Sequence, residues 1–173
     1  MTTSAVALII CDLDGTLISS YMDTPGKRYN AWEVLPGRVE KLAALRAWGD
    51  TVAIATNQGG VGLGYVTESQ ARRKIAAAVA ALALPAETPV AVCFAHPRAR
   101  AYRYRKPSEV ARRKPGGAML RELMDLVGER GRVAYVGDRP EDRQAARDAG
   151  VAFHRADDFF ASADGEPRVL PGP

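Results

Sequence analysis

The apolar residues of this chain gather in short runs that alternate with stretches of helical periodicity. The run over residues 5–11 has neither a helical nor an alternating period, which predicts a short strand buried on both faces, as in a parallel sheet. Four more strands are predicted at residues 51–55, 90–94, 133–136 and 151–153. Strands that alternate with helices at this spacing predict an α/β fold with a doubly wound, Rossmann-like parallel sheet of about five strands.

Amphipathic helices are predicted between the strands. Residues 36–49 form the first, and Thr67 and Gln70 have capping-box spacing at the start of the second. Pro115 suits the first turn of the third helix, and residues 140–150 form the fourth, with proline at the start and glycine at the end. The apolar stripes are Val39, Leu42, Leu45 and Trp48 in the first helix and Met119, Leu120, Leu123, Met124 and Val127 in the third.

Length and composition indicate one soluble, globular domain. The 173 residues are 47% hydrophobic and 25% charged, and no apolar run approaches the roughly 20 residues that span a bilayer. We expect one folded domain over residues 1–163 and a loosely held tail over residues 164–173. The start of the chain lacks a basic leader, and Cys11 and Cys93 lie inside predicted strands, so we expect a cytoplasmic location and no structural disulfide.

Two aspartates end the first predicted strand. Asp12 and Asp14 follow the apolar run directly, and in open parallel sheets the ligand crevice lies beyond the carboxyl ends of the strands. Carboxylates this close repel one another, so either one pKa rises or a cation binds between them, and oxygen ligands favour Mg²⁺. Thr56 and Asn57 end the second strand, and Asp138 follows the fourth.

The sequence D-x-D-G-T-L at residues 12–17 resembles the nucleophile motif of the haloacid dehalogenase-like phosphatases, and three further motifs of that superfamily follow in order. Thr56 fits the second motif, and TNQGGVGLG resembles the subgroup that contains histidinol-phosphate phosphatases, heptose-bisphosphate phosphatases and polynucleotide 3'-phosphatases. The resemblance implies that Asp12 attacks phosphorus to form an aspartyl-phosphate. It also implies that Asp14 protonates the leaving alcohol and later activates water, while Thr56 binds the transferring phosphate.

The third motif of the superfamily is a lysine that pins the phospho-intermediate, and this chain offers two R-K-P triplets for it, containing Lys106 and Lys114. The subgroup pattern R-K-P-x-x-G-M fits residues 113–119, except that Ala118 replaces glycine. We therefore assign Lys114 as the lysine that pins the phospho-intermediate and keep Lys106 in reserve.

The fourth motif, G-D-x-x-x-D, matches residues 137–142. The resemblance implies that Asp138 completes a Mg²⁺ site with Asp12 and the backbone carbonyl of Asp14. Asp142 would support this site from behind. Mg²⁺ is accordingly the expected cofactor.

Basic residues are concentrated between Arg98 and Lys114, where there are eight of them and one acid, Glu109. Such a segment is usually a solvated loop, but beside an acidic metal site it can also hold a polyanionic substrate. The expected substrate contacts are Asn57, Arg103, Arg105, Lys106 and Arg113.

Cys93 and His96 resemble half of the zinc loop found in some heptose-bisphosphate phosphatases. Where those proteins carry C-x-C before R-K-P, this chain has Tyr102, Arg103 and Tyr104, so we expect no structural zinc. The departure also weakens the transfer of the heptose substrate to this chain.

The leading prediction is a Mg²⁺-dependent phosphomonoester hydrolase acting on a small phosphorylated metabolite, such as a sugar phosphate or bisphosphate. The alternative is a polynucleotide 3'-phosphatase acting on DNA or RNA ends, favoured by the basic segment and by DDFF at residues 157–160, which resembles the closing segment of those enzymes. A receiver-type signalling domain is disfavoured because it carries its phosphoacceptor on a later strand than its acidic pair. No segment between Asp14 and Lys114 is long enough for a full cap domain, so we expect an open site unless a partner subunit of a homo-oligomer covers it.

Overall fold

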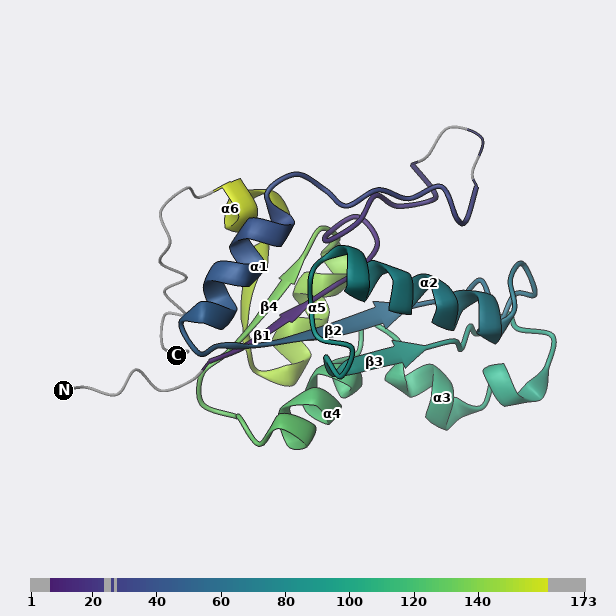
Figure 1. The fold of residues 1–173 in the computed structure, drawn as a ribbon. Coiled ribbons are helices and arrows are strands. Elements are labelled where there is room, and N and C mark those ends of the chain that lie inside the picture. Colours follow the sequence, from purple (N-terminus) through teal and green to yellow (C-terminus); the bar gives the residue numbers. More distant parts are fainter. Residues whose placement is uncertain (1–6, 24–25, 27, 162–173) are drawn as a thin grey trace.

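A parallel β-sheet of five strands forms the centre of the computed structural model, which describes residues 7–23, 26 and 28–161 (Figure 1). Across the sheet the strands follow the order β3-β2-β1-β4-β5, so the first strand lies in the middle. Every neighbouring pair is parallel, which confirms the predicted doubly wound fold. The strands are β1 (Leu8–Cys11), β2 (Thr51–Asn57), β3 (Val90–Cys93), β4 (Val133–Gly137) and β5 (Ala152–Arg155).

Helices cover both faces of the sheet, which gives the molecule three layers (Figure 1). Ile9 and Cys11 of β1 pack against one helical layer, whereas Leu8 and Ile10 pack against the other, and this explains why the run is apolar throughout. One layer contains α1 (Arg38–Ala47), α2 (Glu68–Ala81) and α6 (Ala156–Ala161), and the other contains α4 (Ala118–Val127) and α5 (Pro140–Ala149).

The start and stop signals of two helices have their expected roles. Thr67 Oγ1 accepts a hydrogen bond from Gln70 N at 3.1 Å, and Gln70 Oε1 accepts one from Thr67 N at 2.8 Å, so α2 begins with the predicted capping box. Pro140 is the first residue of α5, and Gly150 ends this helix in the left-handed conformation with a φ of 71°.

The helices around the basic segment differ from the prediction. α4 begins at Ala118 rather than at Pro115, because the preceding residues form a turn in which Gly116 N donates to Arg113 O at 3.0 Å. The segment before this turn contains a short 3₁₀ helix (Tyr102–Tyr104) and α3 (Pro107–Arg112), neither of which has a long enough apolar period to be predicted.

The inner face of α1 also differs from the predicted stripe. Leu42 and Leu45 are buried as expected, but Trp48 lies beyond the last helical residue and is 49% exposed. Arg38 and Lys41 are the other buried residues of this helix, because their cations lie over the rings of two phenylalanines of α6.

The connections within the described residues include no separate cap domain. Between β1 and α1 the described residues form an irregular flap, in which isolated bridges pair Ile18 with Asp14 and with Val34. Among the same residues, no helix has the length and hydropathy required to cross a membrane. The predicted tail over residues 164–173 lies outside the described residues.

Candidate active site

Strand pairing brings the predicted motifs to one edge of the sheet. Cys11, the last residue of β1, lies opposite Ile54 of β2 and Val136 of β4. Because the three strands are parallel, the residues that follow these positions emerge together at the carboxyl edge. The polar residues placed there are Asp12, Thr56 and Asp138.

Lys114 lies within this edge and is only 4% exposed. Its Nζ donates to Asp12 Oδ1 at 2.6 Å and to Asp142 Oδ1 at 2.7 Å, and lies 2.8 Å from the Tyr135 hydroxyl oxygen. Burial alone lowers the pKa of Lys114, but the two carboxylates outweigh it, so this pKa lies above its usual value. The Asn57 amide donates to Lys114 O at 3.2 Å and accepts from Lys114 N at 3.1 Å, and thereby fixes the backbone of the lysine.

Three carboxylates gather beside this lysine. Asp12, Asp138 and Asp142 each offer an oxygen atom, and the three atoms lie within 4.8 Å of one another. Thr16 Oγ1 lies between two of the acids, 3.2 Å from Asp138 Oδ1 and 3.5 Å from Asp12 Oδ2. Burial raises the pKa of Asp12 and that of Asp138, although Lys114 acts to lower the first and Arg139 the second. Three carboxylates that converge in this way offer the oxygen ligands that Mg²⁺ prefers.

Protein donors already occupy the carboxylate of Asp142. Its Oδ1 accepts from Tyr135 OH at 2.8 Å as well as from Lys114, and its Oδ2 accepts from Arg139 N at 3.0 Å. Asp142 therefore has less capacity for a metal ion than Asp138, whose carboxylate accepts a hydrogen bond from Thr16 Oγ1 at 3.2 Å and lies 3.7 Å from Arg139 Nε in a longer ion pair.

Two glycines allow these acids to approach the backbone. Gly15 has a φ of 87°, and a Cβ atom at this position would collide with the carboxylate of Asp138. A Cβ atom at Gly137 would likewise collide with Asp142. The glycines of the first and fourth motifs thus make the acidic cluster sterically possible.

Asp14 contacts a second group of side chains. Its Oδ1 forms an ion pair with Lys74 Nζ, and its Oδ2 accepts from Gln58 Nε2 at 2.8 Å. The same Gln58 nitrogen donates to the buried Thr56 hydroxyl at 2.9 Å. Tyr29 OH donates to Gln58 Oε1 at 2.9 Å, which connects the flap to this group.

Sequence reasoning missed Lys74, Gln58 and Tyr29. A signal for Lys74 was present, because this lysine shares the buried face of α2 with Ile75 and Ala78. Gln58 stands within the quoted TNQ sequence, whereas the flap around Tyr29 has no periodic pattern.

The candidate site opens into a cavity of about 680 Å³ at the carboxyl edge. Both aspartates of the D-x-D motif line it, together with cations from α2 and from several loops. The predicted site residues among its lining are Asp12, Asp14, Asn57, Arg113, Lys114 and Asp142, and the further cations are Lys74, Arg98 and Arg139.

Three predicted substrate contacts lie elsewhere. Arg103, Arg105 and Lys106 are exposed and do not line the cavity. The Arg103 guanidinium lies 4.6 Å from the ring centroid of Tyr104, and Lys106 Nζ lies 5.9 Å from that of Tyr102. The structure therefore brings Lys114, and not Lys106, to Asp12.

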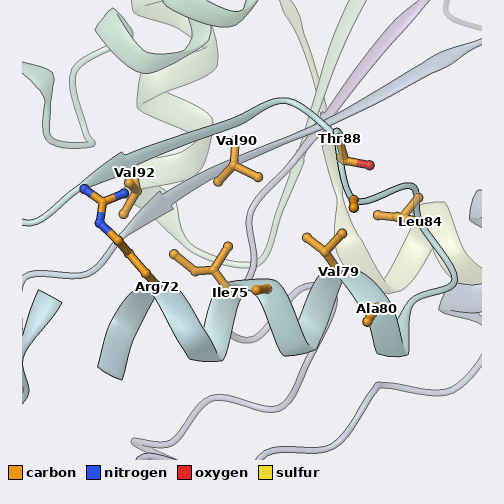
Figure 2. A pocket seen from close by; sticks show the side chains of 10 residues that line it. Arg72, Ile75, Val79, Ala80, Leu84, Thr88, Val90 and Val92 are labelled. Carbon is orange, nitrogen blue, oxygen red and sulfur yellow. The ribbon is translucent and has the colours of Figure 1, made fainter. Parts of the chain in front are cut away.

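A second hollow, of about 340 Å³, lies between α2 and β3 (Figure 2). Figure 2 shows Ile75 and Val79 of α2 opposite Val90 and Val92 of β3, with Arg72 at one end. Its walls are largely apolar and include none of the predicted site residues, so the chemistry belongs to the carboxyl edge.

The half zinc motif has ordinary protein partners. Cys93 is buried, and its Sγ donates to Glu109 O at 3.5 Å. His96 Nδ1 accepts from Arg98 N at 3.1 Å. Within residues 7–23, 26 and 28–161, the cluster of acids at the sheet edge is the one group of three or more His, Cys, Asp or Glu side chains arranged to hold a metal ion.

Comparisons with known proteins agree with these motifs. A family model described as polynucleotide kinase 3 phosphatase matches residues 7–171. The chain is 34% identical over 149 residues to the D-glycero-beta-D-manno-heptose-1,7-bisphosphate 7-phosphatase of Pseudomonas putida, and the match covers 83% of this chain and 78% of that protein.

Solved structures show the same fold. A haloacid dehalogenase-like phosphatase from Mesorhizobium loti superposes with a TM-score of 0.66 at 24% identity, covering 84% of this chain and 69% of that one. The D,D-heptose 1,7-bisphosphate phosphatase of B. bronchiseptica, complexed with magnesium and phosphate, has a TM-score of 0.65 at 26% identity, covering 96% of this chain and 91% of that one. The chain therefore belongs to the polynucleotide kinase 3 phosphatase family and is a phosphatase of the haloacid dehalogenase-like superfamily.

Proposed function

We propose that this phosphatase hydrolyses a sugar bisphosphate through an aspartyl-phosphate formed on Asp12. The observation that carries the proposal is the buried Asp12 carboxylate, which lines the cavity of about 680 Å³, lies 2.6 Å from Lys114 Nζ and has an oxygen atom of Asp138 within 4.8 Å. Phosphoryl transfer needs a nucleophile, positive charge around the transferred group and a proton donor for the leaving group, and this edge supplies candidates for each.

In the proposed reaction, an oxygen of Asp12 attacks phosphorus while the bond from phosphorus to the sugar oxygen breaks. Asp14 gives a proton to the leaving oxygen and then takes one from the water that hydrolyses the intermediate, which releases inorganic phosphate and restores Asp12. The Lys114 ammonium stabilises the negative charge around Asp12, and the Thr56 hydroxyl with the following backbone amides binds phosphate oxygens.

The residues suited to hold Mg²⁺ are Asp12, Asp138 and the backbone carbonyl of Asp14, with Asp142 fixing Lys114 behind them. When bound, the ion supplies positive charge for the phosphate oxygens. Two observations support this assignment: the oxygen-rich cluster of acids, and the magnesium and phosphate in the related heptose phosphatase of B. bronchiseptica.

The substrate class is supported by the relatives and by the cavity. The Pseudomonas putida relative acts, by its name, on a heptose bisphosphate. Arg98, Arg113 and Arg139 line the same cavity as Asp12, so a second phosphate on the sugar has arginines within the site.

A polynucleotide 3'-phosphatase is the second candidate, because the matching family model carries that description and the chain has an exposed basic surface outside the cavity. Arg103, Arg105 and Lys106 are exposed there, and Tyr102 is 61% exposed. Such cations with an aromatic ring suit a nucleic-acid strand that extends beyond the cavity.

The test compares D-glycero-D-manno-heptose 1,7-bisphosphate, nucleoside monophosphates and a 3'-phosphorylated oligonucleotide as substrates in the presence of Mg²⁺. We expect the bisphosphate to have the highest kcat/KM and Asp12→Asn to abolish turnover, because the amide keeps the shape of the side chain but cannot attack phosphorus. Near-normal turnover by Asp12→Asn would exclude Asp12 as the nucleophile. Higher activity on the oligonucleotide, falling steeply between about 50 and 200 mM salt and less steeply in Arg103→Ala, would replace the sugar bisphosphate by a nucleic-acid end.

A further inference from the structure

Lys74 is a buried lysine on α2 for which the proposed reaction assigns no role. Its side chain is 1% exposed, and its Nζ forms an ion pair with Asp14. The neighbouring positions on the buried face of α2 are Ile75 and Ala78, so an apolar residue would suit this position better in a helix that only packs against the sheet. Burial of an ammonium group is unfavourable unless it is paired, and Asp14 is the acid that pairs with it.

The contacts of Asp14 show what this ammonium does. Lys74 holds one carboxylate oxygen, and Gln58 holds the other at 2.8 Å. Gln58 is itself held by the Tyr29 hydroxyl at 2.9 Å, and the Tyr29 ring centroid lies 4.5 Å from Lys74 Nζ. An ionised carboxylate has about four acceptor sites, so two donors fix its orientation and leave acceptor sites for water.

We propose that Lys74 is a positioning residue that orients the Asp14 carboxylate toward the water that hydrolyses the aspartyl-phosphate, and this rests on the proposed function. In this step Asp14 accepts a proton from water, the new bond forms between the water oxygen and phosphorus, and the bond between phosphorus and Asp12 breaks. Without the ammonium, Gln58 alone restrains Asp14, and a displacement of about 1 Å at a catalytic group can cost roughly 100-fold in rate.

Hydrolysis of p-nitrophenyl phosphate by Lys74→Met separates this role from a purely structural one. The nitrophenolate leaves without needing a proton, so formation of the intermediate should proceed normally while its hydrolysis slows. We expect kcat and KM to fall together, by roughly 10- to 100-fold, with kcat/KM nearly unchanged. A rapid-mixing experiment should then show a burst of about one nitrophenolate per protein, because the phosphorylated enzyme accumulates.

Two matched variants test whether the effect is specific to the cation at position 74. Lys74→Arg keeps the cation and should retain part of the kcat that Lys74→Met loses. Lys41→Met removes a buried lysine of α1 and should leave both kcat and kcat/KM unchanged. The Lys74→Met variant is expected to fold, because the neighbours of position 74 on the buried face of α2 are apolar. The Asp14 side chain is 21% exposed and therefore stays in contact with water when its cation is removed. Tyr29→Phe removes the hydrogen-bond donor to Gln58 and leaves the residues of α2 unchanged. It should lower kcat and KM together, by less than Lys74→Met, and it tests the inference if Lys74→Met does not fold.

Asp14→Asn distinguishes the failure of this inference from failure of the proposed function. Suppose that Asp14→Asn accumulates the phosphorylated enzyme, whereas the folded Lys74→Met variant shows either equal losses in kcat and kcat/KM or no loss in either. Lys74 then has no positioning role, and the proposed function stands. If Asp14→Asn itself hydrolyses the intermediate at the normal rate, the role proposed for Asp14 is wrong, and the role of Lys74 is excluded with it.

Discussion

Replacement of Lys114 by methionine removes the positive charge from the centre of the acidic edge while nearly preserving the volume of the side chain. The ammonium of Lys114 is 2.6 Å from Asp12 and 2.7 Å from Asp142, and the lysine is 4% exposed. Breaking a buried ion pair by removing one partner costs about 3–5 kcal/mol, because the other charge stays buried without compensation. For a domain of this size, 1 kcal/mol lowers Tm by about 2–4 °C, so we expect a decrease of roughly 6–20 °C.

The assay is thermal unfolding without metal, followed by turnover of p-nitrophenyl phosphate with Mg²⁺. Lys106→Met is the matched control, because this lysine belongs to the other R-K-P triplet and is exposed. Its removal should change the free energy of unfolding by at most about 0.5 kcal/mol and leave kcat nearly unchanged. Lys114→Met should lose most of kcat, since the transferred phosphate has then lost its fixed cation.

A second substitution tests the reason for the destabilisation. Adding Asp142→Asn to Lys114→Met removes one of the two carboxylates left without a cation, so the double variant should be more stable than Lys114→Met alone. The reasoning is refuted if Lys114→Met melts within about 2 °C of the wild type, or if Lys106→Met costs more turnover than Lys114→Met.

Two further predictions concern the metal site. Burial raises the pKa of Asp12 and that of Asp138, so the metal-free protein loses stability as pH rises through these pKa values. Mg²⁺ compensates the ionised carboxylates, so the gain in Tm on adding Mg²⁺ should be larger near pH 8 than near pH 5. An equal gain at the two pH values would contradict the metal assignment. Gly15→Ala should lower Tm by a few degrees and raise the Mg²⁺ concentration for half-maximal turnover at least several-fold, because the new Cβ displaces the Asp138 carboxylate. Gly49→Ala is the control, because Gly49 also has a positive φ, of 93°, but a Cβ atom there contacts no neighbouring atom. It should leave the Mg²⁺ dependence unchanged.

Prediction from the sequence succeeded where neighbours along the chain decide the outcome. The apolar run before Asp12 predicts β1 because only a strand covered on both faces buries every residue of such a run. The capping box at Thr67 and the proline at the start of α5 are also local signals, and both have their expected roles. The same locality explains the errors around Pro115 and Trp48, where helix boundaries depend on contacts with other segments.

For the candidate site too, local sequence predicts some residues and contacts between distant segments decide others. The aspartates of the first and fourth motifs can be named from the sequence, because their motifs follow directly on predicted strands. The R-K-P-x-x-G-M pattern favours Lys114 over Lys106, but the contact of its ammonium with Asp12 depends on how the chain between β3 and α4 returns to the edge, where Asn57 receives the Lys114 backbone. The role of Asn57 as a support for Lys114, beyond the predicted substrate contact, follows from that return.

The sequence by itself determined the order of strands and helices, the parallel sheet and the acids at its carboxyl edge, because hydrophobic period, caps and motif spacing are properties of neighbouring residues. Only the tertiary structure decided that Lys114 lies against Asp12, that Lys74 pairs with Asp14, and that Arg103 and Lys106 stay outside the cavity. These pairs join residues 60 and 102 positions apart. Contacts over such separations are set by how the helical layers pack on the sheet, since a buried cation is stable only where that packing brings it to a carboxylate.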